Sequence, residues 1–218
     1  PVAVSAPVLG AGLLLAAYLL GSLSGSLILG RLIGVDIRKS GSGNAGGTNA
    51  LRTRGWRFAL GVVAIDVGKG VLAALLPLAV PLESALVWPL QAACGMAAAA
   101  GHVWPVFFGF RGGKGAGTLI GALAVVWPVA AVGVVAVWLL VLFSTGYVGL
   151  STVLAAAALV PLALLGPEIG LAGRLTLALI ASGFIAFTHR DNLRRLCAGT
   201  EYRFEKARLF ARLRRAQR

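Results

Sequence analysis

Charge is scarce in this sequence, and acidic residues are the scarcest. Of its 218 residues 12% are charged and seven are acidic, whereas a soluble domain carries about 25% charged residues. Two-metal phosphotransfer centres need several clustered carboxylates, and seven dispersed acids do not supply them. The two cysteines, Cys94 and Cys197, have no metal-ligand spacing and no reason to pair. We therefore expect a protein without a metal site or cofactor.

Hydrophobic residues predominate in this sequence. They make up 58% of the chain, and the mean hydropathy is +0.89. A transmembrane helix needs about 20 consecutive apolar residues. The apolar runs are 7–33, 57–80, 83–108, 115–143, 146–166 and 170–188. This pattern predicts an all-α, polytopic membrane protein that forms a single domain over residues 1–218.

Positive charge is concentrated beside the apolar runs. Six cations lie between Arg31 and Arg57, and ten lie after His189. Clusters that flank apolar runs mark cytoplasmic segments, so the basic charge indicates a membrane protein, and no nucleic-acid partner is expected. The turns near Glu83 and Glu168, which are almost free of cations, should face outside. The expected cytoplasmic segments are 34–56, 109–114 and a basic tail of about 190–218.

This sidedness constrains the number of spans. Segment 109–114 and the tail lie on the same side, so an even number of crossings must separate them, yet three apolar runs do. Proline removes a backbone donor and breaks helices, so we divide run 115–143 near Trp127-Pro128. The prediction is about seven transmembrane helices, with the N-terminus outside and the C-terminus in the cytoplasm. The alternative is one kinked span and five or six crossings.

The first polar segment, "GSGNAGGTNALR" at 41–52, is rich in glycine and small polar residues. Glycines allow the backbone to approach a ligand, and consecutive N–H groups form an anion site. A helix that starts near Thr48 would add its N-terminus, and Arg52 would follow one turn later to grip phosphate oxygens. The alternative is a flexible loop with a surface arginine. The residues expected to bind phosphate are Gly43, Asn44, Gly46, Gly47, Thr48 and Asn49.

Two further segments share this predicted membrane face. In "GFRGGKGAGT" at 109–118, Lys114 lies between glycines and can reach a phosphate, or it can be a snorkelling lysine of a cytoplasmic loop. The segment is no nucleotide P-loop, because Phe108 stands where that pattern requires glycine. In "THRDNLRRLCAGTE" at 188–201, His189 and Asn192 would share a helix face if the last helix continues through them, or they cap its end. Glu201 suits an ion pair with a nearby arginine.

Two charged residues lie inside an apolar run. Asp66 and Lys69 are three residues apart in 57–80, and charges within a membrane are costly and usually paired. We expect a structural pair that fixes the helix beside the first polar segment; the alternative is a proton or ion pathway. His102 is expected to form an interhelical hydrogen bond.

Three segments together carry a resemblance to a known family. "GSGNAGGTNALR", "GHVWPVFFGFRGGKGAGT" and "HRDNLRRLCAGTE" occur in this order, and with them the chain resembles the bacterial membrane acyl-phosphate:glycerol-3-phosphate acyltransferases. The family commonly has Ala where Gly47 stands and Val-Ala-Thr where 116–118 stand. These differences exchange small residues for small residues.

The resemblance implies a reaction and a set of residues. An acyl group would pass from acyl phosphate to the sn-1 hydroxyl of glycerol 3-phosphate, giving lysophosphatidic acid and inorganic phosphate, the first step of bacterial phospholipid synthesis. The family is described as seven-spanning, in the bacterial cytoplasmic (inner) membrane, with a cytoplasmic active site. The expected partners are these two substrates and membrane lipids, without an obligate protein partner. The functional positions map to Ser42, Arg52, Lys114, His189 and Asn192.

The proton acceptor and the role of Ser42 need separate consideration. His189 is one candidate base, and a substrate phosphate oxygen is the other, which the resemblance favours. An acyl-serine intermediate would need a base beside Ser42, and none lies nearby in the sequence. We therefore expect direct transfer without an acyl-enzyme, with Ser42 positioning a substrate.

Two other classes of function remain open at this point. A transporter of small anions or organic phosphates also uses glycine-interrupted helices, although it should show related halves, and the sequence has no visible repeat. A structural adaptor with a lipid-binding basic tail would not need the glycine-rich segments.

Overall fold

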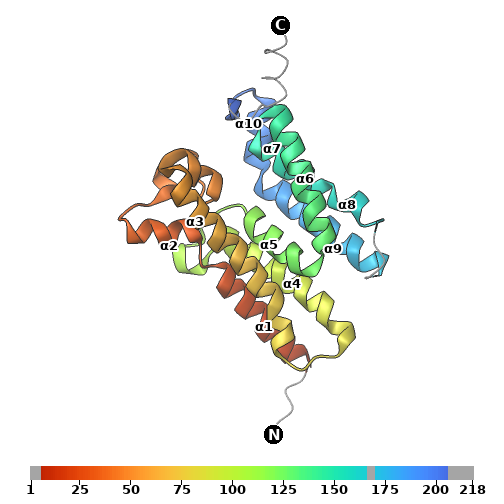
Figure 1. Cartoon of the computed structure of the whole chain (residues 1–218). Coiled ribbons are helices and arrows are strands. Elements are labelled where there is room, and N and C mark those ends of the chain that lie inside the picture. The colour runs from red at the N-terminus through yellow and green to blue at the C-terminus, as the bar shows by residue number, and fades with distance from the viewer. Residues whose placement is uncertain (1–5, 166–169, 206–218) are drawn as a thin grey trace. The chain divides into compact units, whose positions relative to one another are not determined.

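The computed structural model describes residues 6–165 and 170–205, and all secondary structure within these ranges is helical (Figure 1). The chain divides after Pro128 into two compact units, which are described separately. The acidic turn at Glu168 and the tail beyond residue 205 lie outside the described residues. The prediction of a single domain over the whole chain stays a prediction.

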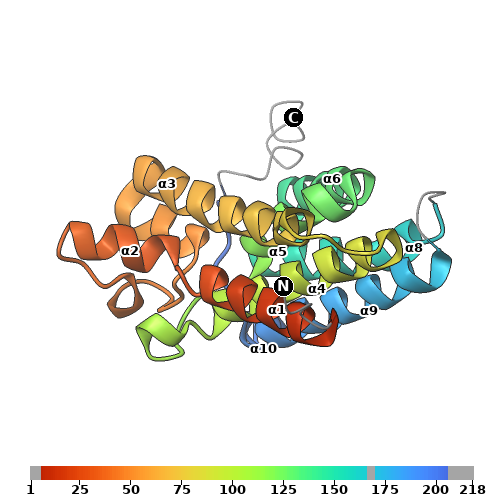
Figure 2. The same cartoon turned by 90° about the horizontal axis from the view of Figure 1, so that it is seen from below.

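The first unit is a bundle of helices. Within it α3 packs against α5 and α4, and α1 packs against α4, as the two views show (Figures 1 and 2). Short 3₁₀ turns occupy Ile37–Lys39, Leu76–Ala79 and Val106–Phe108. The helices of this unit are α1 (Ala6–Gly21), α2 (Gly25–Leu32), α3 (Gly47–Leu75), α4 (Ser84–Val103) and α5 (Ala116–Val126).

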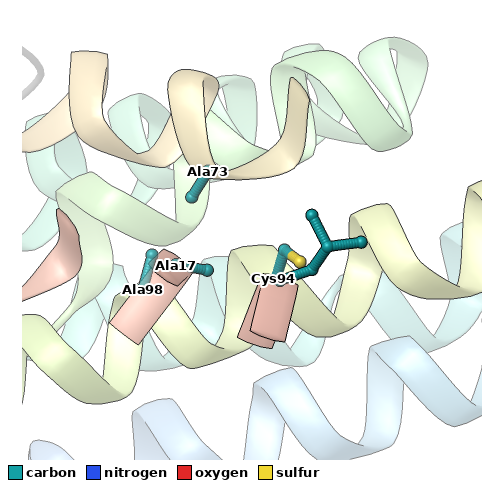
Figure 3. Packing of buried hydrophobic residues seen from close by; sticks show 5 residues of the cluster. Ala17, Ala73, Cys94 and Ala98 are labelled. Atoms are coloured by element: carbon teal, nitrogen blue, oxygen red, sulfur yellow. The ribbon is translucent and has the colours of Figure 1, made fainter. Parts of the chain in front are cut away.

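Small side chains allow these helices to approach closely. Ala17 of α1, Ala73 of α3, and Cys94 and Ala98 of α4 meet in one buried cluster (Figure 3). Helices α3 and α5 also approach closely, because a Cβ atom added at Gly70 would overlap the carbonyl oxygen of Thr118. Small residues at helix contacts are typical of membrane proteins, where packing rather than water exclusion drives helix association.

The first apolar run does not form one straight helix. It breaks at Ser22–Ser24 into α1 and α2, whose axes are bent by 45°. The Ser22 hydroxyl donates a hydrogen bond to the carbonyl oxygen of Tyr18. The Leu23 carbonyl oxygen accepts from Lys69 of α3, and the Gly25 N–H donates to Asp66 of α3. The single span expected over 7–33 is therefore two helices.

Helix α3 carries the end of the first polar segment. It begins at Gly47, so the start expected near Thr48 is confirmed. Its path is interrupted at Gly55, whose φ of 81° and ψ of 178° are non-helical and belong to a region that is essentially restricted to glycine. The two turns with Arg52 are thus separated by a kink from the long apolar part of the helix.

The second unit contains α6 to α10. Helix α9 packs against α7 and α8, and α10 packs against α7. Trp127, with φ −155° and ψ 74°, separates α5 from α6, so the break expected at Trp127-Pro128 is confirmed. The helices are α6 (Pro128–Thr145), α7 (Val148–Ala157), α8 (Leu159–Leu162), α9 (Leu171–Thr188) and α10 (Arg190–Cys197).

Several helices have the dimensions of membrane spans. By length and composition three described stretches qualify, namely 47–79, 128–145 and 171–188, and the bent pair of α1 and α2 adds a fourth if it is one span. Shorter apolar helices cover 116–126 and 148–162. The chain is therefore an all-helical protein with membrane-spanning helices, while the count of seven stays a prediction.

Candidate functional site

The first glycine-rich loop, residues 41–47, is held by a side chain of the helix that follows it. The side-chain oxygen of Asn49 accepts a hydrogen bond from the backbone N–H of Ser42 at 2.9 Å. Its amide nitrogen donates to the carbonyl oxygens of Ile37 and Ser40 at 3.1 and 3.0 Å. Because Asn49 is buried and both amide hydrogens are engaged, its direct task is to hold the loop.

This loop leads into the N-terminus of α3, where the backbone is suited to bind an anion. Gly41 and Gly43 have φ of 60° and 72°, in the left-handed region, and Gly46 is the N-cap residue. The first N–H groups of an α-helix have no intrahelical acceptors. The backbone from Gly47 to Asn49 therefore presents donors and the positive end of the helix dipole.

The second glycine-rich loop, residues 109–115, lies beside the first. The N–H of Ala45 approaches the carbonyl oxygen of Gly112 at 3.4 Å. The guanidinium of Arg38 donates to the carbonyl oxygens of Phe108 and Arg111, each at 3.0 Å. The first unit thus brings together two polar segments that are far apart in the sequence.

Asp36 orients the arginine that joins the loops. Its carboxylate accepts from the Arg38 guanidinium at 2.9 Å and from the Arg38 backbone N–H at 3.0 Å. The side-chain hydrogen bonds from Arg38 hold the pKa of Asp36 at about 2, below the usual 3.8, and the same contact raises the pKa of Arg38. Both groups therefore stay charged throughout the physiological pH range.

Three of the expected functional residues border these loops. Ser42 is exposed at the tip of the first loop, and Arg52 lies half-buried in the second turn of α3. Lys114 is half-buried and precedes Gly115, the left-handed N-cap residue of α5. Asn44, Gly46, Gly47 and Thr48 are likewise half-buried, and Gly43 is exposed.

A buried charged cluster lies under the second loop. Lys69 Nζ is 3.0 Å from Asp66 Oδ1, and His102 Nδ1 is 3.3 Å from the same oxygen. The His102 carbonyl accepts from the N–H of Gly113 at 3.1 Å. The expected pairing of Asp66 with Lys69 is present, and it includes His102 from another helix.

In the second unit, His189 lies at the junction of two helices. Helix α9 ends at Thr188 and α10 begins at Arg190, so no uninterrupted helix runs through His189 and Asn192. His189 is buried, and its Nδ1 is 2.9 Å from the carbonyl oxygen of Ile185. A carbonyl only accepts hydrogen bonds, so Nδ1 carries a proton, and in the neutral ring Nε2 holds a lone pair.

Asn192 is positioned by an acid. Its amide nitrogen donates to Glu201 Oε1 at 2.7 Å, while Arg195 Nε donates to Glu201 Oε2, also at 2.7 Å. Gly149 of α7 faces Asn192 so closely that an added Cβ would lie 2.7 Å from the Asn192 Cβ. Glu201 therefore has the ion pair expected for it, and it also orients Asn192.

Comparison with known proteins identifies the family. A family model described as glycerol-3-phosphate acyltransferase matches residues 11–199. The chain belongs to the glycerol-3-phosphate acyltransferase family. Among curated members, that of Geotalea daltonii is 39% identical over 194 residues, which cover 89% of this chain and 97% of that protein. That of Geobacter sulfurreducens is 38% identical, with 87% and 94% covered.

Solved acyltransferase structures share the fold. The crystal structure of PlsY (YgiH), an integral membrane glycerol 3-phosphate acyltransferase, in its glycerol 3-phosphate form superposes with a TM-score of 0.80 and 34% identity. It covers 92% of this chain and 98% of that chain. The lysophosphatidic acid form of the same enzyme gives a TM-score of 0.78.

In this member of the acyltransferase family, sequence reasoning missed the residues that support the loops. In the sequence, Arg38 is only one of the six cations between Arg31 and Arg57, Asp36 was not singled out, and Asn49 was expected to donate to the ligand. A signal was present for Asp36, since an acid among cations is unusual in so acid-poor a chain. The spacing of two between Asp36 and Arg38 does not predict that Arg38 reaches a loop seventy residues away.

Proposed function

We propose that this protein transfers an acyl group from acyl phosphate to the sn-1 hydroxyl of glycerol 3-phosphate, with lysophosphatidic acid and inorganic phosphate as products. Family membership supports the reaction class, and the two ligand forms of PlsY match the acceptor and the product. The observation that carries the proposal is the pairing of the two glycine-rich loops by Ala45–Gly112 and Arg38.

Each loop has its own role in this proposal. The N–H groups of residues 46–49, at the α3 N-terminus, bind the phosphate of acyl phosphate. Those of Gly43 and Ala45 bond instead to Ser40 and Gly112 and, with Asn49, keep this loop in shape. Arg52 and Lys114 bind the phosphate of glycerol 3-phosphate, Arg52 with two parallel donors and Lys114 as a point charge. Ser42, exposed at the loop tip, orients a substrate through its hydroxyl.

The transfer itself is direct. The sn-1 oxygen attacks the acyl carbonyl carbon, the carbon–oxygen bond to phosphate breaks, and phosphate leaves with the bonding electrons. The hydroxyl proton goes to a phosphate oxygen or to His189, whose Nδ1 donates to the Ile185 carbonyl oxygen, so that Nε2 is the basic nitrogen of the neutral ring. Asn192, held by Glu201, binds the acceptor. Acyl phosphate is already activated, so orientation and charge stabilisation supply most of the catalysis.

An acyl-enzyme would leave a mass signature. With direct transfer, protein quenched in acid during turnover of palmitoyl phosphate has the mass of the unmodified chain. A stoichiometric palmitoyl adduct that disappears in Ser42→Ala would contradict direct transfer and leave the overall reaction standing.

The remaining part of the proposal concerns the membrane. Basic segments 34–56, 109–114 and the tail suggest a multi-pass protein of the bacterial cytoplasmic membrane, with about seven spans and the loops on the cytoplasmic side. Acyl phosphate then enters from the lipid and glycerol 3-phosphate from the cytoplasm. No protein partner is required by this scheme.

The first experiment compares three forms of the purified protein in detergent. Palmitoyl phosphate and glycerol 3-phosphate are supplied, and phosphate and lysophosphatidic acid are measured for wild type, Arg52→Ala and Arg54→Ala. We expect product from wild type and from Arg54→Ala, whose exposed arginine lies on the same turns of α3, and a loss of about 100-fold or more in kcat/KM for Arg52→Ala.

Other results would revise the proposal in distinct ways. Equal rates for wild type and Arg52→Ala would keep the reaction and remove the assigned role of Arg52. Absence of product with wild type, while palmitoyl-CoA is also inactive as donor, would contradict the acyltransferase and favour phosphate transport, which flux into proteoliposomes then measures.

A further inference from the structure

The cluster of Asp66, Lys69 and His102 is fully enclosed by the first unit. Their side chains are 5%, 3% and 4% exposed, respectively. Asp66 and Lys69 lie on α3, and His102 lies in the last turn of α4. Helices α3, α4 and α5 pack against one another. Because these side chains are almost completely enclosed, direct contact with substrate is not their role.

Hydrogen bonds join the three side chains to one another and to the backbone of a neighbouring segment. Lys69 Nζ donates to Asp66 Oδ1 at 3.0 Å and to the Leu23 carbonyl oxygen at 3.1 Å. His102 Nδ1 lies 2.9 Å from Lys69 Nζ and 3.3 Å from Asp66 Oδ1, within hydrogen-bond distance of both. Asp66 Oδ1 also accepts from the Gly25 N–H at 3.1 Å.

These hydrogen bonds connect the break between α1 and α2 to the second glycine-rich loop, which contains Lys114. At one end Leu23 and Gly25 belong to the break between α1 and α2. At the other end the His102 carbonyl accepts from Gly113, and the ring faces the same residue so closely that a Cβ at Gly113 would overlap Nε2. Gly117 lies over Asp66, with 3.6 Å between an added Cβ and the Asp66 Cβ. Lys114 lies between these two glycines.

We propose that Asp66, Lys69 and His102 are positioning residues, which hold the 112–115 loop so that Lys114 meets the phosphate of glycerol 3-phosphate. The inference rests on the proposed function, in which Lys114 binds this substrate. A buried ion pair adds little net stability, since apolar residues of equal volume in its place often make the fold equally stable. A directional network, by contrast, sets the place of a loop to a fraction of an ångström, which packing of a glycine-rich backbone cannot do.

The test uses substitutions that differ in what they keep. His102→Leu removes the polar ring that bonds within the cluster and lies over Gly113. His102→Asn keeps a polar side chain that can bond to Lys69 or Asp66. The double variant Asp66→Asn with Lys69→Met removes both charges together, so that neither is left buried alone, and it retains an acceptor for Gly25. Gln91→Leu, a buried polar residue of the same helix as His102, is the matched control.

Steady-state kinetics with palmitoyl phosphate separates positioning from a structural role. We expect His102→Leu and the double variant to raise the KM for glycerol 3-phosphate by about 10- to 100-fold, with the KM for palmitoyl phosphate within about twofold of wild type. His102→Asn should recover most of the effect, and Gln91→Leu should change neither constant. A purely structural role would lower the melting temperature and the active fraction, hence kcat, and leave both KM values unchanged; that result would overturn the inference.

A double-mutant cycle identifies the residue through which the cluster acts. In a Lys114→Ala background, His102→Leu should not raise the KM for glycerol 3-phosphate further, because the contact that it misplaces is already absent. Independent, multiplicative effects would overturn the inference and leave the acyltransferase proposal intact. An inactive wild type would overturn both, and the Arg52 experiment reports that failure separately.

Discussion

At the scale of single residues, Asn49 shows that a residue type does not determine its role. An asparagine in a glycine-rich segment can donate a hydrogen bond to a ligand, or it can hold the loop through hydrogen bonds to the backbone. In the structure it bonds three backbone groups, of Ile37, Ser40 and Ser42. The shape of the loop thus depends on a buried side chain whose hydrogen bonds all go to backbone groups of its own chain.

We therefore expect Asn49→Ala to disrupt the structure of the first loop, and substrate binding to weaken as a consequence. Three hydrogen bonds, one buried and two partly buried, are lost and three backbone groups are left without this partner, which corresponds to about 2–4 kcal/mol of unfolding free energy. The melting temperature in detergent should fall by several degrees, and acyl transfer should be lost. Thr53→Val, which removes one hydroxyl bond to the Asn49 carbonyl, is the control and should lose less than about 1 kcal/mol. An Asn49→Ala variant as stable as wild type would contradict the clasp.

Asp36 predicts a pH effect of definite sign. Its pKa of about 2 in the folded chain lies below the usual 3.8, so its stabilisation is present in full above about pH 5 and is lost as the pH falls toward 2. The side chain is partly exposed, and the contribution is below about 1 kcal/mol. The melting temperature of wild type should exceed that of Asp36→Asn at pH 7, and the difference should shrink below pH 4. A difference that grows on acidification would contradict this account.

At the scale of helices, local chemistry decided some boundaries and distant contacts decided others. The start of α3 after its glycines and the break at Trp127-Pro128 were predicted, because glycine and proline act on their own backbone. The break at Ser22–Ser24 was not, since its backbone groups bond to Lys69 and Asp66, more than forty residues away. An apolar run shows that residues avoid water, but not where they bend.

Two glycines on α3 allow a matched test of helix packing. Gly70 faces α5, where a Cβ would overlap the Thr118 carbonyl oxygen, whereas Gly68 has open space around it. Gly70→Ala should separate the helices and cost about 1–3 kcal/mol. Gly68→Ala should be neutral or stabilise by up to about 1 kcal/mol through helix propensity. Thermal unfolding of both variants checks this, and equal melting temperatures would refute the close α3–α5 approach.

At the scale of the whole molecule, the distribution of charge predicts how the chain lies in the membrane. Cys197 of α10 is exposed and Cys94 is buried. A membrane-impermeant maleimide should therefore label wild type in inside-out vesicles but not in right-side-out vesicles, and Cys197→Ser should abolish the signal. In the Cys197→Ser background, Glu83→Cys should label with the opposite preference, since Glu83 is exposed in the predicted outer turn. Labelling of Cys197 from outside would reverse the assigned orientation.

The sequence predicts which residues bind phosphate, but it indicates little of how the candidate site is built. Motifs such as "GSGNAGGTNALR" indicate phosphate-binding residues because few residue types bind an anion, and this assignment stays a prediction. The loop supports Arg38 and Asn49 were not predictable, because they act through backbone carbonyls and N–H groups that no sequence pattern marks. The pairing of Asp66 with Lys69, the interhelical hydrogen bond of His102 and the ion pair of Glu201 were predicted, because each is a polar group in surroundings that require a partner.

The kink at Gly55 mechanically separates the two parts of α3. A straight helix would turn Arg52 whenever its apolar part tilts to match the thickness of the bilayer. With a non-helical residue between them, the apolar stretch can follow the lipid while the first two turns stay with the loops. We expect acyl transfer by this protein to depend only weakly on bilayer thickness, and Gly55→Ala, which constrains this joint, to make the rate sensitive to lipid chain length.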